Sequence, residues 1–597
     1  MKTRVRLLFI VGTASLMFAS LGAQDWRHGQ PPQSERSAGH YVPDLAPLTA
    51  AQSSELRELV DRYVADLAAL RRFYSVPNST LQITRFKAFN EAWLVRLDAV
   101  DFESLGVEGR IDWHLLRAHL RHDTGLLERA AARNAEMAGL LPFADSLARL
   151  QESRRQFEPI KPSETAAALD QLTKEIAALR KALESEGAKP GKIVALRAAG
   201  QLEDLGKAFK DWFEYANGYD PQFGWWNREP YKDATAAIED YRKFLREKIV
   251  GVKAGEDEPI VGDPIGAAGL AGDLEREMIS YTPAELIAIA EREFSWCEAE
   301  WKKVAGEMGL GEDWMAALER TKQDFVAPGD QPALIAEQAY EAIDFLLQRD
   351  LITIPTHAID TWRMAMMSPE RQKVAPFFLG GEQILVSFPT DAMDQADKLD
   401  SLRANNRHFC RAVVHHELIP GHHLQGWYNQ RSNPHRRLFY TPFWGEGWAL
   451  WWEFRLWDLG FAQSPENKAG MLFWRTHRAA RIIFSLNFHL GKWTPEQCIN
   501  FLVERVGHDR HTATGEVRRS FNGDYSPLYQ VGYMMGAIQI RALYDELVRN
   551  GKMPEKEFHD RILRGNTMPI ELVRAHLTNT KLPRDYQSSW KFAGEKP

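Results

Sequence analysis

Apolar residues recur at helical intervals from Thr49 to about Lys248. Spacings of three and four residues place such side chains on one face of a helix, where they can pack against a neighbouring helix. One such set is Leu56, Leu59, Val60, Tyr63, Leu67 and Leu70. Helix starts are marked later in the chain as well, because Thr282–Glu285 and Thr494–Gln497 match the capping-box pattern with proline at the first helical position. We therefore expect a mostly α-helical fold.

Histidine is concentrated in one short segment of the chain. His415, His416, His422 and His423 lie within nine residues, together with the carboxylate of Glu417. Neutral imidazole is a common zinc ligand, and a carboxylate beside a metal-bound water is the usual general base of a metallohydrolase. Such a density of ligand side chains is hard to explain by packing alone, so we interpret the segment as a metal site.

The spacing of these histidines excludes a straight helix through the site. His422 and His423 follow His416 by six and seven residues. Six residues turn a helix by about 600°, which points the side chain away, and seven residues move it about 10 Å along the axis. Pro420 and Gly421 permit a break, because proline removes a ladder hydrogen bond and glycine tolerates unusual dihedrals. We expect His422 to face the metal with His416, and His423 to lie behind the ligands or to be packed in the wall.

A third ligand is expected, because a catalytic zinc usually has three protein ligands and one open position. Glu446 lies 24 residues after His422 and between two glycines, and we predict that it is this ligand. Glu453 is the rival; seven residues further on, it shares a helical face with Glu446 and could instead hydrogen-bond a ligating histidine. Solvated charges are the other interpretation of both glutamates, which four tryptophans surround in the sequence.

Three segments of the chain resemble one bacterial family, the domain of unknown function 885 family. His416–Gln425 is similar to its H-E-x-x-P-G-H-H motif, and Glu446–Glu453 is similar to its E-G-W-A-L-Y-x-E segment, with Trp451 in place of the tyrosine. Leu528–Gly532 resembles its late Tyr-x-x-Gly segment, but Asp524–Pro527 stands where the family has Pro-Gly-Gln. The resemblance covers most of the mature chain and implies a helical zinc metallopeptidase of the gluzincin type.

A peptidase of this kind also needs a donor for the oxyanion that forms on the substrate carbonyl. The resemblance to helical zinc peptidases implies a tyrosine and a histidine from the late part of the chain. Tyr529 is the predicted catalytic residue and Tyr533 a predicted substrate-binding residue, with His508 and His511 as further candidates. Both tyrosines could equally be core residues of an amphipathic helix.

Two further segments could contact a substrate. Residues 382–389 are short, apolar and partly β-branched, which is the clearest strand pattern in a helical chain. Gluzincins hold the substrate main chain against a strand before the zinc helix. Ile384 and Val386 are therefore predicted to bind substrate, with a plain hairpin as the alternative. Arg518 and Arg519 could clamp a substrate carboxylate, although a pair of surface charges is the better interpretation.

The first residues have the pattern of a secretory signal peptide. Basic residues precede the apolar stretch Leu7–Phe18, and small residues follow up to Ala23. The stretch is too short to cross a bilayer comfortably. Residues 24–46, rich in Pro, Ser, Gln and Gly, are expected to form an extended arm, and no later segment is long and apolar enough for a membrane span. We therefore expect a secreted or periplasmic protein.

Charge and cysteine content make other classes of protein improbable. The formal net charge of −7 is mild for 597 residues and comes without a basic stripe, so we expect no nucleic-acid partner. The three cysteines lack C-x-x-C spacing and are expected to be buried free thiols, with a single disulfide as the alternative.

Together these features predict an exported, zinc-dependent peptidase that hydrolyses short peptides. Glu417 would take a proton from zinc-bound water and pass it to the leaving amine. The expected fold is a large two-lobed helical ellipsoid around a deep cleft, formed by residues 47–597, with a joint near residues 251–272 and a small β element beside the zinc helix. The alternatives are a zinc amidase or esterase acting on a non-peptide substrate, and a non-catalytic helical binding protein.

Overall fold

A computed structural model describes residues 41–46, 48, 54–185, 190–253, 255, 258–372, 377–523 and 525–594. The predicted signal peptide, residues 1–23, and most of the predicted arm, residues 24–46, lie outside the described residues. The chain divides into two units, Met1–Pro43 and Asp44–Pro597. Every helix and strand from α2 onward belongs to the second unit.

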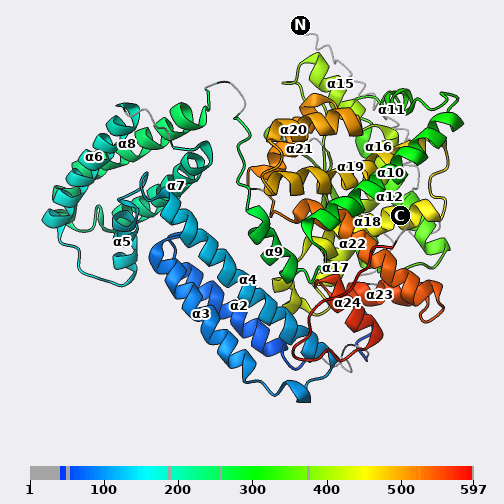
Figure 1. The fold of residues 1–597 in the computed structure, drawn as a ribbon, viewed down its shortest axis with the longest axis horizontal. Coiled ribbons are helices and arrows are strands. Elements are labelled where there is room, and N and C mark those ends of the chain that lie inside the picture. The colour runs from blue at the N-terminus through cyan, green and yellow to red at the C-terminus, as the bar shows by residue number, and fades with distance from the viewer. Residues whose placement is uncertain are drawn as a thin grey trace, which may run out of the picture. The chain divides into compact units, whose positions relative to one another are not determined.

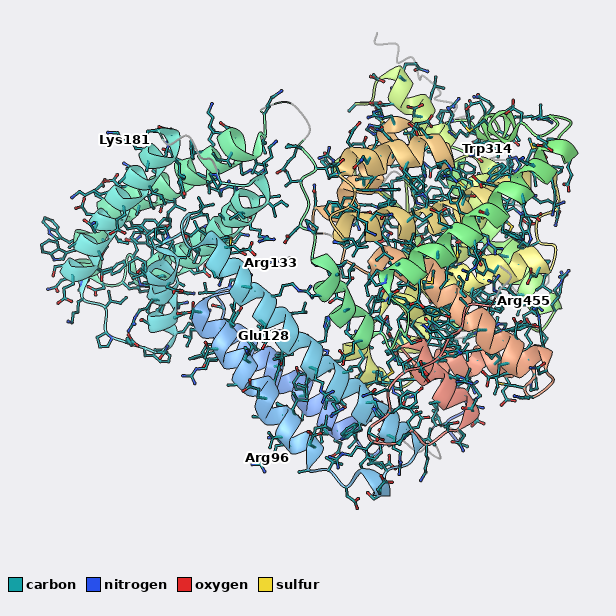
Figure 2. All side chains as sticks on the ribbon, in the orientation of Figure 1. Arg96, Glu128, Arg133, Lys181, Trp314 and Arg455 are labelled. Carbon is teal, nitrogen blue, oxygen red and sulfur yellow. The ribbon has the colours of Figure 1, made fainter. Side chains whose placement is uncertain are left out.

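Three long helices open this unit (Figure 1). They are α2 (Arg57–Phe73), α3 (Thr80–Asp98) and α4 (Val107–Met137), with the 3-10 turn η3 (Phe102–Ser104) before α4. Of the periodic apolar residues, Val60, Tyr63 and Leu67 are buried, as the helical spacing predicts. On the exposed side Lys87 of α3 bonds Glu128 of α4 at 2.9 Å, and Figure 2 shows Glu128 on that helix.

The next four helices pack around a hydrophobic core of their own. They are α5 (Ala144–Arg155), α6 (Pro162–Ser185), α7 (Lys192–Ala216) and α8 (Pro221–Phe244), followed by the π-helical turn η4 (Leu245–Val250). Figure 1 shows α6 and α8 side by side, and these two helices contact each other extensively. The buried aromatic side chains of this core include Phe209, Trp212, Phe223 and Tyr241.

The predicted joint near residues 251–272 carries a charged contact to the helices before it. Asp263 lies 2.6 Å from a guanidinium nitrogen of Arg133 on α4. Arg133 is labelled in Figure 2. Its other carboxylate oxygen accepts a hydrogen bond from Arg197 on α7. The division of residues 47–597 into subdomains at this joint stays a prediction.

The remaining helices form a second and larger core that also includes α2–α4. Their first half comprises α9 (Gly266–Arg276), α10 (Pro283–Glu307), α11 (Trp314–Lys322), α12 (Gln331–Gln348), α13 (Thr356–Thr361), α14 (Pro369–Gln372), α15 (Gln395–Ala404), α16 (Arg407–Glu417) and α17 (His422–Asn429). Their second half comprises η5 (Pro434–Phe439), α18 (Pro442–Asp458), α19 (Pro465–His489), α20 (Pro495–Phe501), η6 (Leu502–Val506), α21 (Arg510–Phe521), α22 (Tyr529–Tyr544), η7 (Asp545–Arg549), α23 (Glu555–Gly565) and α24 (Ile570–Thr578). Within the described residues no helix is both long enough and apolar enough to cross a membrane.

Helix α19 lies in the middle of this core. It contacts α10, α16 and α22, and every residue from Ala469 to His489 is buried. The neighbouring pair α18 and α22 packs unusually closely, because Gly447 and Gly536 meet with no side chain between the two backbones. A Cβ atom on Gly447 would lie 2.6 Å from the Cα of Gly536, so only glycine allows this approach.

A small β element interrupts the helices, and the mostly α-helical fold class is confirmed. Strand β1 (Arg363–Met366) pairs in parallel with β2 (Gln383–Val386), with Arg363 opposite Gln383. Leu379 adds an antiparallel bridge to Leu385. The predicted strand is therefore present, and its ladder partner is a strand from about twenty residues earlier rather than the other arm of a plain hairpin.

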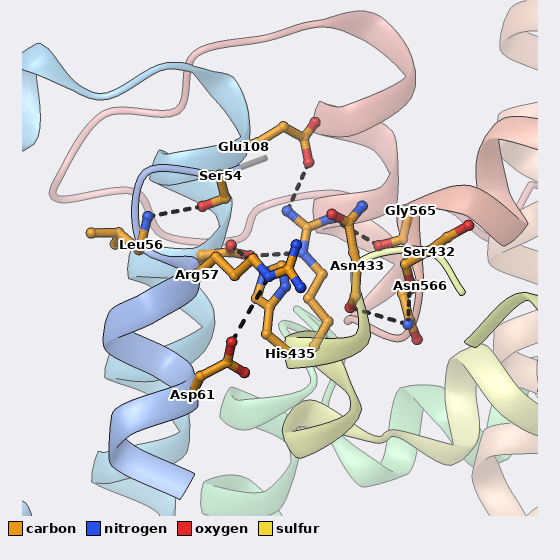
Figure 3. A network of polar contacts seen from close by, with 12 residues as sticks. Ser54, Leu56, Arg57, Asp61, Glu108, Ser432, Asn433, His435, Gly565 and Asn566 are labelled. Carbon is orange, nitrogen blue, oxygen red and sulfur yellow. Dashed lines mark hydrogen bonds and ion pairs between the residues drawn. The ribbon is translucent and has the colours of Figure 1, made fainter. Parts of the chain in front are cut away.

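A buried polar network joins the first helices to the last ones (Figure 3). The guanidinium group of Arg436 in η5 is fully buried and donates to Asp112 Oδ1 (2.7 Å), Glu108 Oε2 (2.7 Å) and the carbonyl of Gly565 (2.8 Å). His435 Nε2 lies 2.7 Å from the other oxygen of Asp112. The guanidinium group of Arg436 thus connects α4 and η5, which lie more than 300 residues apart in the sequence.

Candidate metal centre

The predicted break in the histidine segment is present. Helix α16 ends at Glu417 and α17 begins at His422, so the four residues between them are not helical. The indole nitrogen of Trp448 on α18 donates to the carbonyl of Pro420 at 2.8 Å. The turn is therefore attached to the helix that carries Glu446.

Three ligand-type side chains converge at this break. His416 from the end of α16, His422 from the start of α17 and Glu446 from α18 each place one donor atom within 4.8 Å of the other two. The Oε2 atom of Glu446 lies 3.4 Å from His416 Nε2 and 3.1 Å from His422 Nε2. The two imidazole rings meet edge to face, with centroids 4.9 Å apart.

The spacing of these donors fits zinc. A tetrahedral ion with bonds of about 2.0–2.1 Å holds its ligand atoms roughly 3.3 Å apart, close to the two distances from Glu446. Burial alone would raise the pKa of Glu446, but the charges and hydrogen bonds of His422 and His416 hold it well below its ordinary value. The cluster brings one carboxylate and two imidazole rings together, and with both rings neutral this is a suitable donor set for a divalent cation.

Glu453 lies behind His416 rather than among the ligands. Its Oε1 atom is 2.7 Å from His416 Nδ1, the ring nitrogen on the far side from Glu446. A carboxylate in this position orients a ligating imidazole and increases its basicity. Of the two glutamates on α18, Glu446 therefore lies among the three donor side chains and Glu453 lies behind His416.

A cavity of about 330 Å³ opens onto the three donors. Its described lining includes His416, Glu417, His422 and Glu446, together with the segment Phe377–Gly380. Gly380 lies directly against Glu417, and a Cβ atom there would come within 2.7 Å of the Cα of Glu417. The absence of a side chain at this position leaves room for the carboxylate in the cavity wall.

Both predicted tyrosines line the cavity. Tyr529, at the start of α22, donates its hydroxyl hydrogen to Glu446 Oε1. Tyr533, one turn later, stacks on the ring of His416 with centroids 6.2 Å apart. Burial first, and then the negative charge of Glu446, raises the pKa of both phenols, so both keep their protons at neutral pH.

Several candidate residues lie outside the donor cluster, and for His423 this position was expected. His423 is buried and places Nε2 2.7 Å from the carbonyl of Ala358, away from the donors. His508 is buried against His477, with 2.8 Å between ring nitrogens, and His511 is exposed. The side chains of Ile384 and Val386 are buried in the core and are not part of the described cavity lining, to which their neighbours Leu379 and Gly380 contribute.

Four buried residues of the cavity region were not foreseen as a group. Arg478 and Arg481 of α19 and Arg519 of α21 line the cavity, and Glu516 lies between the last two. The expected surface pair Arg518–Arg519 is therefore wrong for Arg519, which is 8% exposed. A signal existed in the sequence: arginines at intervals of three, from Arg475 to Arg481, stand in a segment otherwise rich in apolar residues.

Comparison with known proteins places the fold. A candidate lipoprotein of unknown function from Shewanella oneidensis has a similar structure, with a TM-score of 0.64 and 17% identity over 88% of this chain and 100% of that one. A candidate lipoprotein from Colwellia psychrerythraea gives a TM-score of 0.54 and 16% identity over 84% and 91% of the two chains. No curated protein matches the chain in sequence. Residues 77–577 match the family described as "Bacterial protein of unknown function (DUF885)", and the chain belongs to this family.

Proposed function

We propose that this protein is a zinc-dependent peptidase. One observation carries the proposal: the donor atoms of His416, His422 and Glu446 converge at the wall of a cavity that the carboxylate of Glu417 also lines. Two histidines and a glutamate form a known ligand set of catalytic zinc, and a further carboxylate beside the ion is the usual general base. Structural zinc sites, by contrast, fill all four positions with protein ligands.

Each residue of the site has its own role in the proposed hydrolysis. A zinc ion held by His416, His422 and Glu446 would supply a Lewis acid and lower the pKa of water in the cavity. Glu417 takes a proton from the attacking water and later gives it to the leaving amine. It follows His416 directly at the end of α16, and its side chain lines the same cavity as the three donors.

Negative charge then develops on the carbonyl oxygen of the substrate and needs hydrogen-bond donors. Tyr533 and Tyr529 line the same cavity and keep their protons, so they are the proposed donors. The single hydroxyl hydrogen of Tyr529 is donated to Glu446, so this bond must break before Tyr529 can donate to the oxyanion. The cavity of about 330 Å³ is at the lower end of the usual range for ligand sites, about 300–1,000 Å³. Short peptides are therefore the proposed substrates.

Export is part of the same proposal. Residues 1–23 have the composition of a signal peptide, and the two similar structures are described as candidate lipoproteins. We expect the protein outside the cytoplasm after cell fractionation. Recovery of the full-length chain in the cytoplasmic fraction alone would contradict export without affecting the chemistry.

The experiment that tests the chemistry is the substitution Glu417→Gln. It keeps the shape of the side chain and removes its basicity, so hydrolysis of a peptide library should fall by about 10²-fold or more. Zinc content, measured by elemental analysis of the same sample, should stay near one ion per chain.

The matched control is Glu504→Gln in η6, where the side chain is exposed and is not part of the described cavity lining. It should leave hydrolysis unchanged. Near-normal turnover by Glu417→Gln would mean that another group is the base. A wild-type protein that binds no zinc, or that cleaves simple esters and amides but no peptide, would contradict the proposed function.

A further inference from the structure

Helix α19 is buried from Ala469 to its end and yet carries arginines three residues apart. Arg475, Arg478 and Arg481 are only 8%, 5% and 1% exposed. A buried guanidinium group is costly unless carboxylates or other acceptors surround it. The three arginines differ in the carboxylates that lie near their guanidinium groups.

Arg475 has its own carboxylate partner away from the cavity. One of its terminal nitrogens lies 2.8 Å from Glu293 Oε2, and Arg475 is not part of the described cavity lining. Arg478 and Arg481 both line the cavity, and so does Arg519 from α21. These three form the arginine wall of the cavity.

The arginine wall has more positive than negative charge. Glu516 is shared, with Oε1 at 2.7 Å from Arg481 Nε and Oε2 at 2.8 Å from Arg519 Nε. Arg478 lies 3.7 Å from Glu453, whose carboxylate is already hydrogen-bonded to His416. Two carboxylates therefore serve three guanidinium groups and an imidazole.

Some donors of the arginine wall also lack acceptors. Among the described residues, Nη1 of Arg481 and the Nε atoms of Arg478 and Arg519 are buried without a hydrogen-bond partner, and so is Nε of Arg475 outside the cavity. An unpaired buried donor costs the free energy of its lost hydration. A negatively charged ligand in the cavity would balance the excess positive charge of the arginine wall.

The arginine wall lies close to the candidate metal centre. Tyr533 stacks on His416 at 6.2 Å, and its ring centroid is 4.8 Å from the Cζ atom of Arg478 and 4.6 Å from that of Arg481. The distance from the His416 ring to the Tyr533 ring and the distance from there to the guanidinium groups together correspond to at most about three residues of extended peptide, at roughly 3.3–3.6 Å per residue. A substrate could thus touch the donors and the arginines at once.

We propose that the arginine wall, Arg478, Arg481 and Arg519, binds the C-terminal carboxylate of the substrate. The planar guanidinium fork matches the two oxygens of a carboxylate. This inference deepens the proposed function and rests on it: the peptidase removes one to three residues from the C-terminal end. The limited volume of the cavity favours a chain end over a peptide that passes through.

The test measures binding separately from hydrolysis. The zinc-loaded Glu417→Gln protein is titrated calorimetrically with matched libraries of N-acetylated tetrapeptides that end in a free carboxylate or in a carboxamide. The free acids should bind at least about tenfold more tightly, because a site built for a polar group rejects the analogue that lacks it. Adding Arg481→Lys should remove most of this difference, since an ammonium group cannot replace the planar fork.

The control is Arg475→Lys in the same background, on the same helix but outside the cavity, and it should preserve the preference for free acids. Arg478→Lys is the second test variant if circular dichroism shows that Arg481→Lys fails to fold.

Equal affinity for acids and amides overturns the inference even if the wild type hydrolyses peptides. A preference for acids that depends on Arg481 or Arg478 supports it even if no hydrolysis is seen, so the two proposals fail separately. Amides with an internal Glu or Asp that bind as tightly as the free acids would overturn the assignment to the chain end.

Discussion

At the scale of single residues, the donor cluster depends on a side chain that stands behind it. Glu453 hydrogen-bonds Nδ1 of His416 and leaves Nε2 facing Glu446. Burial would raise the pKa of Glu453, but the hydrogen bond to His416 and the charge of Arg478 hold it below its ordinary value. The carboxylate is therefore charged at neutral pH and sets the orientation of the imidazole.

We expect Glu453→Gln to weaken zinc binding by about 10- to 100-fold while the fold is kept, because a supporting carboxylate contributes this much to metal affinity. Competition with a chelator of known affinity measures the change. Asp458→Asn, an exposed carboxylate on the same helix, should leave the affinity unchanged. Equal zinc affinity of Glu453→Gln and the wild type would show that Glu453 has only a packing role.

At the scale of elements, the turn between α16 and α17 decides which histidine joins the donor cluster. The turn places His422 beside Glu446 and leaves His423 next to Ala358 on α13. A straight helix through these residues could bring neither histidine to the same ion as His416. Two neighbouring residues of the same type thus have different environments.

This difference predicts opposite outcomes for two matched substitutions. His422→Ala should lose zinc, because it removes one of the three donors, whereas His423→Ala should keep about one zinc per chain. Elemental analysis of the two purified proteins gives the answer directly. Full zinc occupancy in His422→Ala, or loss of zinc in His423→Ala with the fold intact, would require a different ligand set.

At the scale of the whole described unit, the chain depends on contacts between its early and late helices. The clearest of these contacts is made by Arg436, which is fully buried and donates hydrogen bonds to Asp112 and Glu108 of α4. Glu108 is labelled in Figure 3. Burial would raise the pKa of Asp112, but the charge of Arg436 and the hydrogen bond of His435 lower it. Burial would raise the pKa of Glu108 as well, but the hydrogen bond of His576 and then the charge of Arg436 lower it to about 2.

Arg436→Met should lower the free energy of unfolding by about 3–5 kcal/mol, because it leaves a buried carboxylate without its cation. Urea denaturation at neutral pH measures the loss. Arg437→Met, the exposed neighbour, should cost little. A loss as small as that of the control would mean that the network does not hold the early and late helices together.

The same loss should depend on pH in a defined direction. Because the pKa of Glu108 is lowered from 4.5 to about 2 on folding, its stabilising contribution is complete above pH 4.5 and disappears as the pH falls through 2. The difference in stability between the wild type and Arg436→Met should therefore shrink over this acid range.

Local patterns in the sequence determined the helices and most of the metal cluster. Helix periodicity and the capping boxes at Thr282 and Thr494 depend on neighbouring residues, and both boxes are present. The break at Pro420–Gly421 is equally local, since it follows from backbone chemistry. Within this segment His416 and His422 could be chosen as a pair, because a two-residue bulge at Pro420–Gly421 returns His422 to the place of the fourth residue after His416 in a regular helix.

Only the tertiary structure decided what lies opposite each side chain. Glu453 contacts His416, which lies 37 residues away in the sequence, and Arg481 donates a hydrogen bond to Glu516, which lies 35 residues away. The buried position of Arg519 and the charge of the arginine wall follow from the packing of α19 against α21 and α22, which no spacing along the chain reveals. The physical reason is that burial and charge balance depend on residues distant in the chain, whereas helix formation and helix breaking depend on near neighbours.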